Sequence, residues 1–236
     1  MMRKENMELV FEGLDTYADV YLNDECILKA DNMFRRWSIP VRQYIREENN
    51  ILKVYFHSPV KIDVPKWDAL PYQYPASNDQ SENGGLFNKK ISIFARKAGY
   101  HYGWDWGPRL VTSGIWRPVY IRAWSDLRIN DVFIEQKEVG AGRAVIAGHV
   151  ELDADKDMDG VLVTITDEAT GRVLGEWQAD LKRGTNRVTV DFVLHKPKLV
   201  VGVMDWGSLS FIVSVRISLQ VGNCWTLKPK GWAYAL

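Results

Sequence analysis

Short runs of alternating apolar and polar residues, separated by turn residues, dominate the chain. The runs are rich in Val, Ile, Tyr, Phe and Trp, as is typical of half-buried strands. They predict strands at residues 8–12, 18–22, 50–56, 116–122, 128–136, 143–152, 160–167, 172–177, 186–194 and 211–219. Turn chemistry at 23–24, 48–50 and 169–172 separates several of these runs, and near the start only residues 41–46 resemble a helical turn. The pattern predicts an all-β chain.

The spacing of the strands predicts two β-sandwiches that meet near residues 123–126. Residues 1–125 are expected to form an antiparallel jelly roll. Residues 126–236 carry about seven short strands at the spacing of an immunoglobulin-like sandwich. With 236 residues the chain can bury such cores without disulfide or metal staples.

The segment 58–88 breaks this pattern because it is long, rich in Pro, Asn and Tyr, and without regular period. A segment of this kind in a compact domain is usually functional or disordered. Its aromatic residues Trp67, Tyr72, Tyr74 and Phe87 favour an ordered binding loop.

Residues 96–108 carry the most informative local motif, which reads Arg-Lys-Ala-Gly-Tyr-His-Tyr-Gly-Trp-Asp-Trp-Gly-Pro. Asp105 lies between Trp104 and Trp106, an arrangement that is costly inside a core because a buried carboxylate needs partners. Indole faces beside a hydrogen-bond acceptor suit a pyranose, which has an apolar C–H face and a rim of hydroxyls. The alternative is a tight turn at a strand end with one indole packed inward.

Composition excludes several classes of partner. Thirty basic and thirty acidic residues give zero formal net charge, and no dense Lys/Arg run is present, which argues against nucleic acid and anionic membranes. No apolar stretch approaches the roughly 20 residues of a membrane span. Cys26 and Cys224 match no CxxC spacing and the four histidines are scattered, so we expect free thiols, no metal and no cofactor.

Several motifs resemble a known family. Residues 13–23 (Gly-Leu-Asp-Thr-Tyr-Ala-Asp-Val-Tyr-Leu-Asn), then 32–34 (Asn-Met-Phe), then 52–59 resemble the sugar-binding domain of glycoside hydrolase family 2. Residues 96–108, followed by 112–119 (Thr-Ser-Gly-Ile-Trp-Arg-Pro-Val), resemble its β-mannosidase branch. The resemblance runs from about residue 9 to residue 199.

The resemblance implies an N-terminal jelly roll, immunoglobulin-like sandwiches and a (β/α)8 barrel whose two glutamates hydrolyse β-mannosides with retention. No βα alternation follows residue 219, so we assign no catalytic residue in this chain. The chain is expected to be a non-catalytic portion of such an enzyme. Its expected partners are a β-mannoside or manno-oligosaccharide and the barrel of the full-length protein.

The resemblance also suggests roles for the motif. Asp105 would accept hydrogen bonds from sugar hydroxyls, and Trp104 and Trp106 would shape the wall of the subsite. Arg96 and Lys97 would orient that carboxylate or reach the sugar, with a salt bridge that only holds the loop as an equal alternative.

Two departures from the family pattern remain. Members carry further strands before the equivalent of Leu9, so we expect Met1 to be an internal start and the jelly roll to lack its first strands. After about residue 199 the family sequence reappears only in another reading frame, so residues 200–212 and 221–236 are expected to be frame-shifted. Ordinary divergence is the alternative.

Three functions stay open at this point. The leading one is the non-catalytic portion of a β-mannosidase-like glycosidase, or of a relative specific for β-galactosides or β-glucuronides. The others are a stand-alone carbohydrate-binding module and a structural interaction domain. The sequence assigns no compartment.

Overall fold

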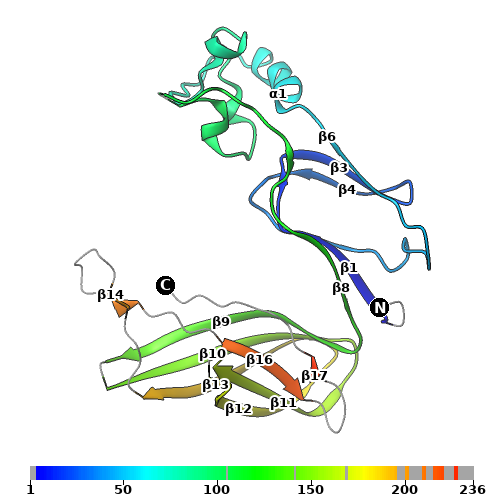
Figure 1. Cartoon of the computed structure of the whole chain (residues 1–236), viewed down its shortest axis with the longest axis vertical. Helices are drawn as coiled ribbons and strands as arrows, with labels where there is room; N and C mark the ends of the chain where they lie inside the picture. Colours follow the sequence, from blue (N-terminus) through cyan, green and yellow to red (C-terminus); the bar gives the residue numbers. More distant parts are fainter. Residues whose placement is uncertain are drawn as a thin grey trace. The chain divides into compact units, whose positions relative to one another are not determined.

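A computed structural model describes residues 4–104, 106–140, 142–167 and 170–195 and, beyond them, the backbone of four short strands. The chain divides into two compact units, Met1–Trp124 and Ser125–Leu236. In both units β-strands account for most of the regular secondary structure, as Figure 1 shows, which confirms the all-β prediction.

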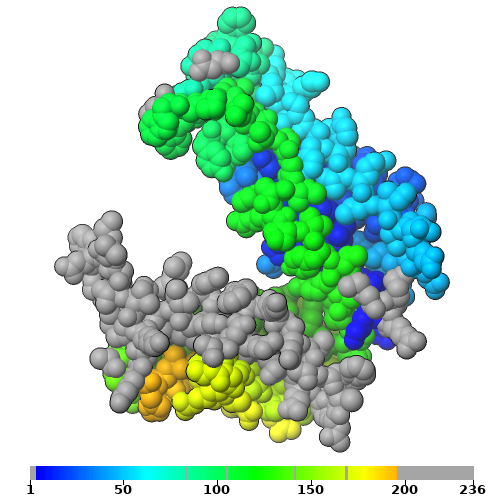
Figure 2. Space-filling view, viewed as in Figure 1, coloured from blue at the N-terminus to red at the C-terminus, as the bar shows by residue number. Residues whose placement is uncertain are grey.

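The first unit contains three antiparallel sheets, ordered β5-β1-β8, β4-β3-β6 and β2-β7. Their strands are β1 (Asn6–Phe11), β2 (Leu14–Asp15), β3 (Tyr17–Leu22), β4 (Glu25–Asp31), β5 (Trp37–Pro40), β6 (Leu52–Phe56), β7 (Gly114–Ile115) and β8 (Val119–Trp124). Strands far apart in sequence are neighbours: in Figure 2 the green surface of β8 runs beside the blue β1 with which it pairs. One core gathers buried residues from both three-stranded sheets, from β2 and from the segment after β5: Met7, Leu9, Phe11, Leu14, Ala18, Val20, Leu22, Ala30 and Val41.

The segment after β6 is ordered, as its aromatic residues indicated, but it begins with a helix that the sequence pattern did not predict. This helix, α1 (Pro59–Asp68), starts where the Ser58 side chain accepts a hydrogen bond from the Lys61 N–H at 3.4 Å. Its buried residues Pro59, Asp63 and Trp67 recur every four positions, so one face is covered although only one of them is a large apolar residue. An interior proline, Pro65, further masks the helical signal.

Three 3-10 helices follow: η1 (Ser81–Gly84), η2 (Ile91–Ile93) and η3 (Gly99–Tyr102). A small separate core of Trp67, Ile91, Ala95 and Tyr102 holds them together. Residues 96–104 therefore rest on an ordered support.

The second unit is a β-sandwich, with sheets ordered β13-β10-β9 and β12-β11-β16-β17 and a short β14-β15 pair. Its strands are β9 (Leu127–Val139), β10 (Arg143–Ala154), β11 (Met158–Asp167), β12 (Val173–Leu181), β13 (Gly184–His195), β14 (Val200–Val201), β15 (Leu209–Ser210), β16 (Val215–Gln220) and β17 (Thr226–Leu227). Its core includes Ile146, Val150, Leu152, Val161, Val163, Ile165, Val190 and Phe192. The frame-shift hypothesis concerns residues 200–212 and 221–236, and most of these, Cys224 among them, lie outside the described residues.

Candidate functional site

A tight bend at Gly103 directs the chain from the interior of the first unit to its surface. Tyr102, immediately before the bend, is fully buried. Gly103 has a φ of 120°, and a Cβ there would lie 2.8 Å from the side chain of Gln80. The Gln80 N–H donates to the Tyr102 carbonyl at 2.9 Å, and its side-chain amide donates to the Trp104 carbonyl. The bend thus needs glycine, and Gln80 holds the residues on either side of Gly103 through these two hydrogen bonds.

The Lys97–Asp15 ion pair anchors the start of the motif. Lys97 Nζ lies 2.5 Å from Asp15 Oδ1, also donates to Asp15 Oδ2, and donates to the Thr112 carbonyl at 2.7 Å. The Thr16 hydroxyl donates to the same carboxylate. The side chain of Lys97 is 0% exposed, and burial lowers its pKa while Asp15 opposes that shift. These contacts agree with a salt bridge that holds the loop, since no part of the ammonium faces solvent.

His101 extends this buried network. Its Nε2 lies 4.0 Å from Asp15 Oδ2, and its Nδ1 lies 3.1 Å from the Thr112 hydroxyl. The ring also stacks on the exposed ring of Tyr100, with centroids 4.7 Å apart. The histidine therefore joins the motif to the segment just before β7.

Met33 connects a second loop to the motif. Its N–H donates to the Arg96 carbonyl at 3.0 Å, and the Ala98 N–H donates to its sulfur at 3.0 Å. The indole N–H of Trp116 donates to the Met33 carbonyl at 2.9 Å. Arg96 is exposed beside this junction, and the neighbouring Phe34 is also exposed.

A second buried ion pair anchors the end of the motif. Arg109 Nε lies 3.5 Å from Asp79 Oδ1, and the Ser92 N–H donates to Asp79 Oδ2 at 2.8 Å. The side chain of Asp79 is 0% exposed and that of Arg109 is 5% exposed. Because Lys97 and Arg109 are both fixed, Trp104 and Trp106 lie between two anchored points of the chain.

The hydroxyl of Tyr102 lies buried within the same support. Burial is the largest cause that raises the pKa of Tyr102, and the carboxylates of Asp63 and Asp79 raise it further. Asp63 itself accepts hydrogen bonds from Tyr17 at 2.9 Å and from Lys66 at 2.6 Å, and so joins α1 to β3. Tyr102 therefore stays protonated as a structural anchor.

Beyond the bend, the two indoles project into solvent. Trp104 is 46% exposed and Trp106 is 84% exposed. Their ring centroids are 5.8 Å apart and their planes meet at 71°. Neither indole is packed inward, in contrast to the alternative of a core turn. Two exposed apolar faces at this angle form an open corner that can contact the C–H face of a ring-shaped ligand.

Of the five predicted site residues, the structure places Arg96, Lys97, Trp104 and Trp106 in one segment, with Lys97 buried and the others exposed. Asp105, the residue with the central predicted role, lies outside the described residues. Sequence reasoning missed the acidic partners Asp15 and Asp79. The sequence gives no local signal for Asp79, which lies in the polar stretch Ser-Asn-Asp-Gln-Ser, and Asp15 is marked only by its place in Gly-Leu-Asp-Thr-Tyr.

The described part of the chain holds no group of three or more His, Cys, Asp or Glu arranged to bind a metal ion. Likewise, no helix in this part is long and apolar enough to cross a membrane. The described site offers two exposed indoles and an exposed guanidinium, which suit the binding of a ring-shaped polar ligand.

Comparison with known proteins defines the class. A family model described as "Glycosyl hydrolase 2 galactose-binding domain-like" matches residues 1–117, and the first unit is a domain of this class. Beta-mannosidase B of Thermothelomyces thermophilus is 32% identical over 195 residues, which cover 81% of this chain and 21% of the relative. Beta-mannosidase B of Neosartorya fischeri is 38% identical over 128 residues, covering 54% of this chain and 14% of the relative.

Solved structures agree with these relatives. A β-D-mannosidase from Dictyoglomus thermophilum superposes with a TM-score of 0.73 at 26% identity, covering 96% of this chain and 27% of that one. A β-glucuronidase of family 2, at 15% identity and a TM-score of 0.61, shares the fold, covering 92% of this chain and 21% of that one. The chain belongs to glycoside hydrolase family 2, and the curated relatives with which it aligns are β-mannosidases. It spans about a fifth of the curated relatives it matches.

Proposed function

We propose that this chain is the N-terminal, non-catalytic portion of a β-mannosidase-like retaining glycosidase that acts on terminal β-D-mannosyl residues. The observation that carries the proposal is the 32% identity to Beta-mannosidase B over 195 residues. Residues 1–125 would be the sugar-binding domain and residues 126–236 the immunoglobulin-like domain. Its partners would be a β-mannoside or manno-oligosaccharide and the catalytic barrel of the full-length protein.

The geometry of the first unit supports a role in holding sugar. Trp104 and Trp106 expose indole faces that meet at 71°, at the end of an anchored segment. Asp105 lies between them in sequence, where an ionised carboxylate can accept short hydrogen bonds from sugar hydroxyls. Arg96 would reach the sugar or the carboxylate from the neighbouring junction, whereas Lys97 would act as a positioning residue through Asp15.

Bond cleavage would take place elsewhere in the full-length enzyme. A retaining mechanism needs two carboxyl groups about 5–5.5 Å apart, one as nucleophile and one as acid/base. We assign neither role to a residue of this chain. The first unit would instead fix the terminal sugar so that the scissile bond meets those carboxyls.

Intrinsic tryptophan fluorescence tests the binding role. Mannose is expected to change the emission saturably, and Trp106→Ala should remove most of that change because its indole is 84% exposed in the motif. Tyr55→Ala is the matched control, since Tyr55 on β6 is 58% exposed and lies outside the motif. A response that is absent, or that persists in Trp106→Ala, would contradict the proposal.

Hydrolysis of 4-nitrophenyl β-D-mannoside tests the non-catalytic assignment separately. The purified chain is expected to release no nitrophenol above the rate in buffer. Release that grows in proportion to the protein concentration would show that this chain carries the catalytic carboxyls.

A further inference from the structure

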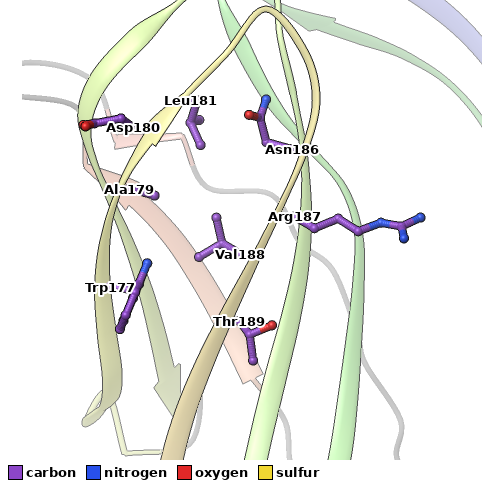
Figure 3. Close-up of a pocket in the computed structure, with 8 residues that line it drawn as sticks. All are labelled: Trp177, Ala179, Asp180, Leu181, Asn186, Arg187, Val188 and Thr189. Carbon is purple, nitrogen blue, oxygen red and sulfur yellow. The ribbon is translucent and has the colours of Figure 1, made fainter.

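A cleft of about 450 Å³ opens in the second unit between β12 and β13 (Figure 3). Its lining residues are Trp177, Ala179, Asp180, Leu181, Asn186, Arg187, Val188 and Thr189. Strand β12 ends one sheet of the sandwich and β13 ends the other. In the described structure each therefore pairs on one side only, and the backbone groups of its other edge are available to a ligand.

Trp177 forms an unusual wall of this cleft. Trp177 on β12 lies directly opposite Val163 on β11. Residues directly opposite each other share a face of the sheet, and Val163 is fully buried, so the Trp177 side chain lies on the inner face. Even so, it is 54% exposed. Two residues earlier the sheets approach closely, because a Cβ on Gly175 would lie 2.8 Å from Val190. The cleft thus opens beyond Gly175 and presents one indole to solvent.

The buried residues of the lining are apolar, and no charged side chain of the lining faces Trp177. Leu181 and Val188 are buried, and Figure 3 shows Val188 pointing into the space beside Trp177. Arg187 and Asp180 point away from this space in the same view. Arg187 Nε lies 3.2 Å from Glu151 Oε2, and Asp180 accepts a hydrogen bond from the Gly160 N–H at 2.8 Å.

From this geometry we infer that the β12–β13 cleft is a second binding site, for a neutral saccharide. Its volume falls in the range of small-ligand sites, about 300–1,000 Å³. The exposed face of Trp177 suits the C–H face of a pyranose, and the strand edges can bond its hydroxyls. Since the two charged lining residues have partners and point away, an anionic ligand gains nothing here. The site does not depend on Asp105 or on the first unit.

Amide-resolved NMR of the full chain with mannotetraose and, separately, cellotetraose tests this site. At least one of the two is expected to shift the amides of residues 175–181 and 186–190 saturably. Trp177→Ala should weaken binding at these amides about tenfold, which corresponds to about 1.4 kcal/mol. Tyr55→Ala is the control, because Tyr55 is a similarly exposed aromatic residue, 58% exposed, that belongs to the first unit and does not line the cleft. It should leave the shifts unchanged.

Three outcomes would overturn the inference. The first is that neither saccharide shifts these amides, and the second is that the shifts persist in a Trp177→Ala chain whose spectrum remains folded. The third is that a hydrophobic peptide or self-association shifts these amides while the saccharides do not, which would make the cleft a protein-docking surface. Amides 99–107 report on the first unit in the same spectra, so failure here and failure of the proposed function are distinguishable.

Discussion

Replacement of Lys97 by Met removes the cation that anchors the motif and keeps a side chain of similar length. It leaves the Asp15 carboxylate, which is 6% exposed, with the Thr16 hydroxyl and, at 4.0 Å, His101 Nε2 as its partners in the described structure. Removal of one partner of a buried ion pair typically costs about 3–5 kcal/mol, because the other charge stays buried without compensation. That loss is large against the about 5–15 kcal/mol that stabilises a typical domain.

Urea unfolding measures this cost through the unfolding transition of the first unit. Lys89→Met is the matched control, because Lys89 and Asp68 form a 2.7 Å ion pair whose side chains are 34% and 52% exposed. An exposed pair of this kind contributes about 0–1 kcal/mol. The double variant Asp15→Asn/Lys97→Met should recover at least about 1 kcal/mol of the loss, since no charge is then left unpaired.

A loss in Lys97→Met no larger than in Lys89→Met would refute the reasoning. So would an unchanged free energy of unfolding together with lost mannose binding, because Lys97 would then contact the sugar instead of the loop. The assignment of Lys97 as a positioning residue depends on this result.

Two further predictions concern the same support. Gly103→Ala should destabilise the first unit by about 1–3 kcal/mol and weaken mannose binding, because the φ of 120° at Gly103 and the nearby Gln80 side chain leave no room for a Cβ. An unchanged free energy of unfolding in urea would contradict this prediction. Burial keeps Tyr102 protonated above its ordinary pKa, so its contribution to stability is complete below about pH 10 and is lost as the pH rises further. Tyr102→Phe should therefore flatten the fall in the free energy of unfolding above about pH 10, by at most about 1.4 kcal/mol per pH unit, and an equal slope in both chains would refute it.

The alternation of apolar and polar residues predicted most of the fold. The long strands of the second unit agree with the pattern because their inward positions carry Val, Ile or Leu, as Val161, Val163 and Ile165 do on β11. The turn before β4 also agrees, since Asn23 and Asp24 adopt the positive φ that these residues tolerate.

The strands β4 and β5 and the helix α1 were not predicted. Residues of β4 are mostly exposed or half-buried, so alternation is weak there. The helix α1 depends on tertiary contacts of Asp63 and Trp67 that a local pattern does not contain. In these elements packing against distant segments outweighs local propensity.

In the candidate site, too, the local sequence predicted some features, whereas others depend on contacts between distant segments. The motif at residues 96–108 located the exposed indoles, because an Asp between two Trp is hard to place in a core. The partners that hold it, Asp15 and Asp79, lie 82 and 30 residues away from Lys97 and Arg109. Such long-range pairs follow from the fold, and neither spacing nor composition indicates them.

Calorimetric titration of mannose into the wild-type chain and into Asp105→Ala tests the central claim most directly. The account predicts a saturable heat for the wild type that Asp105→Ala abolishes, while Asp68→Ala, a change at an exposed carboxylate of the same unit, leaves it intact. An identical heat in the wild type and Asp105→Ala, or no heat in either, would contradict the claim that this unit holds the terminal sugar.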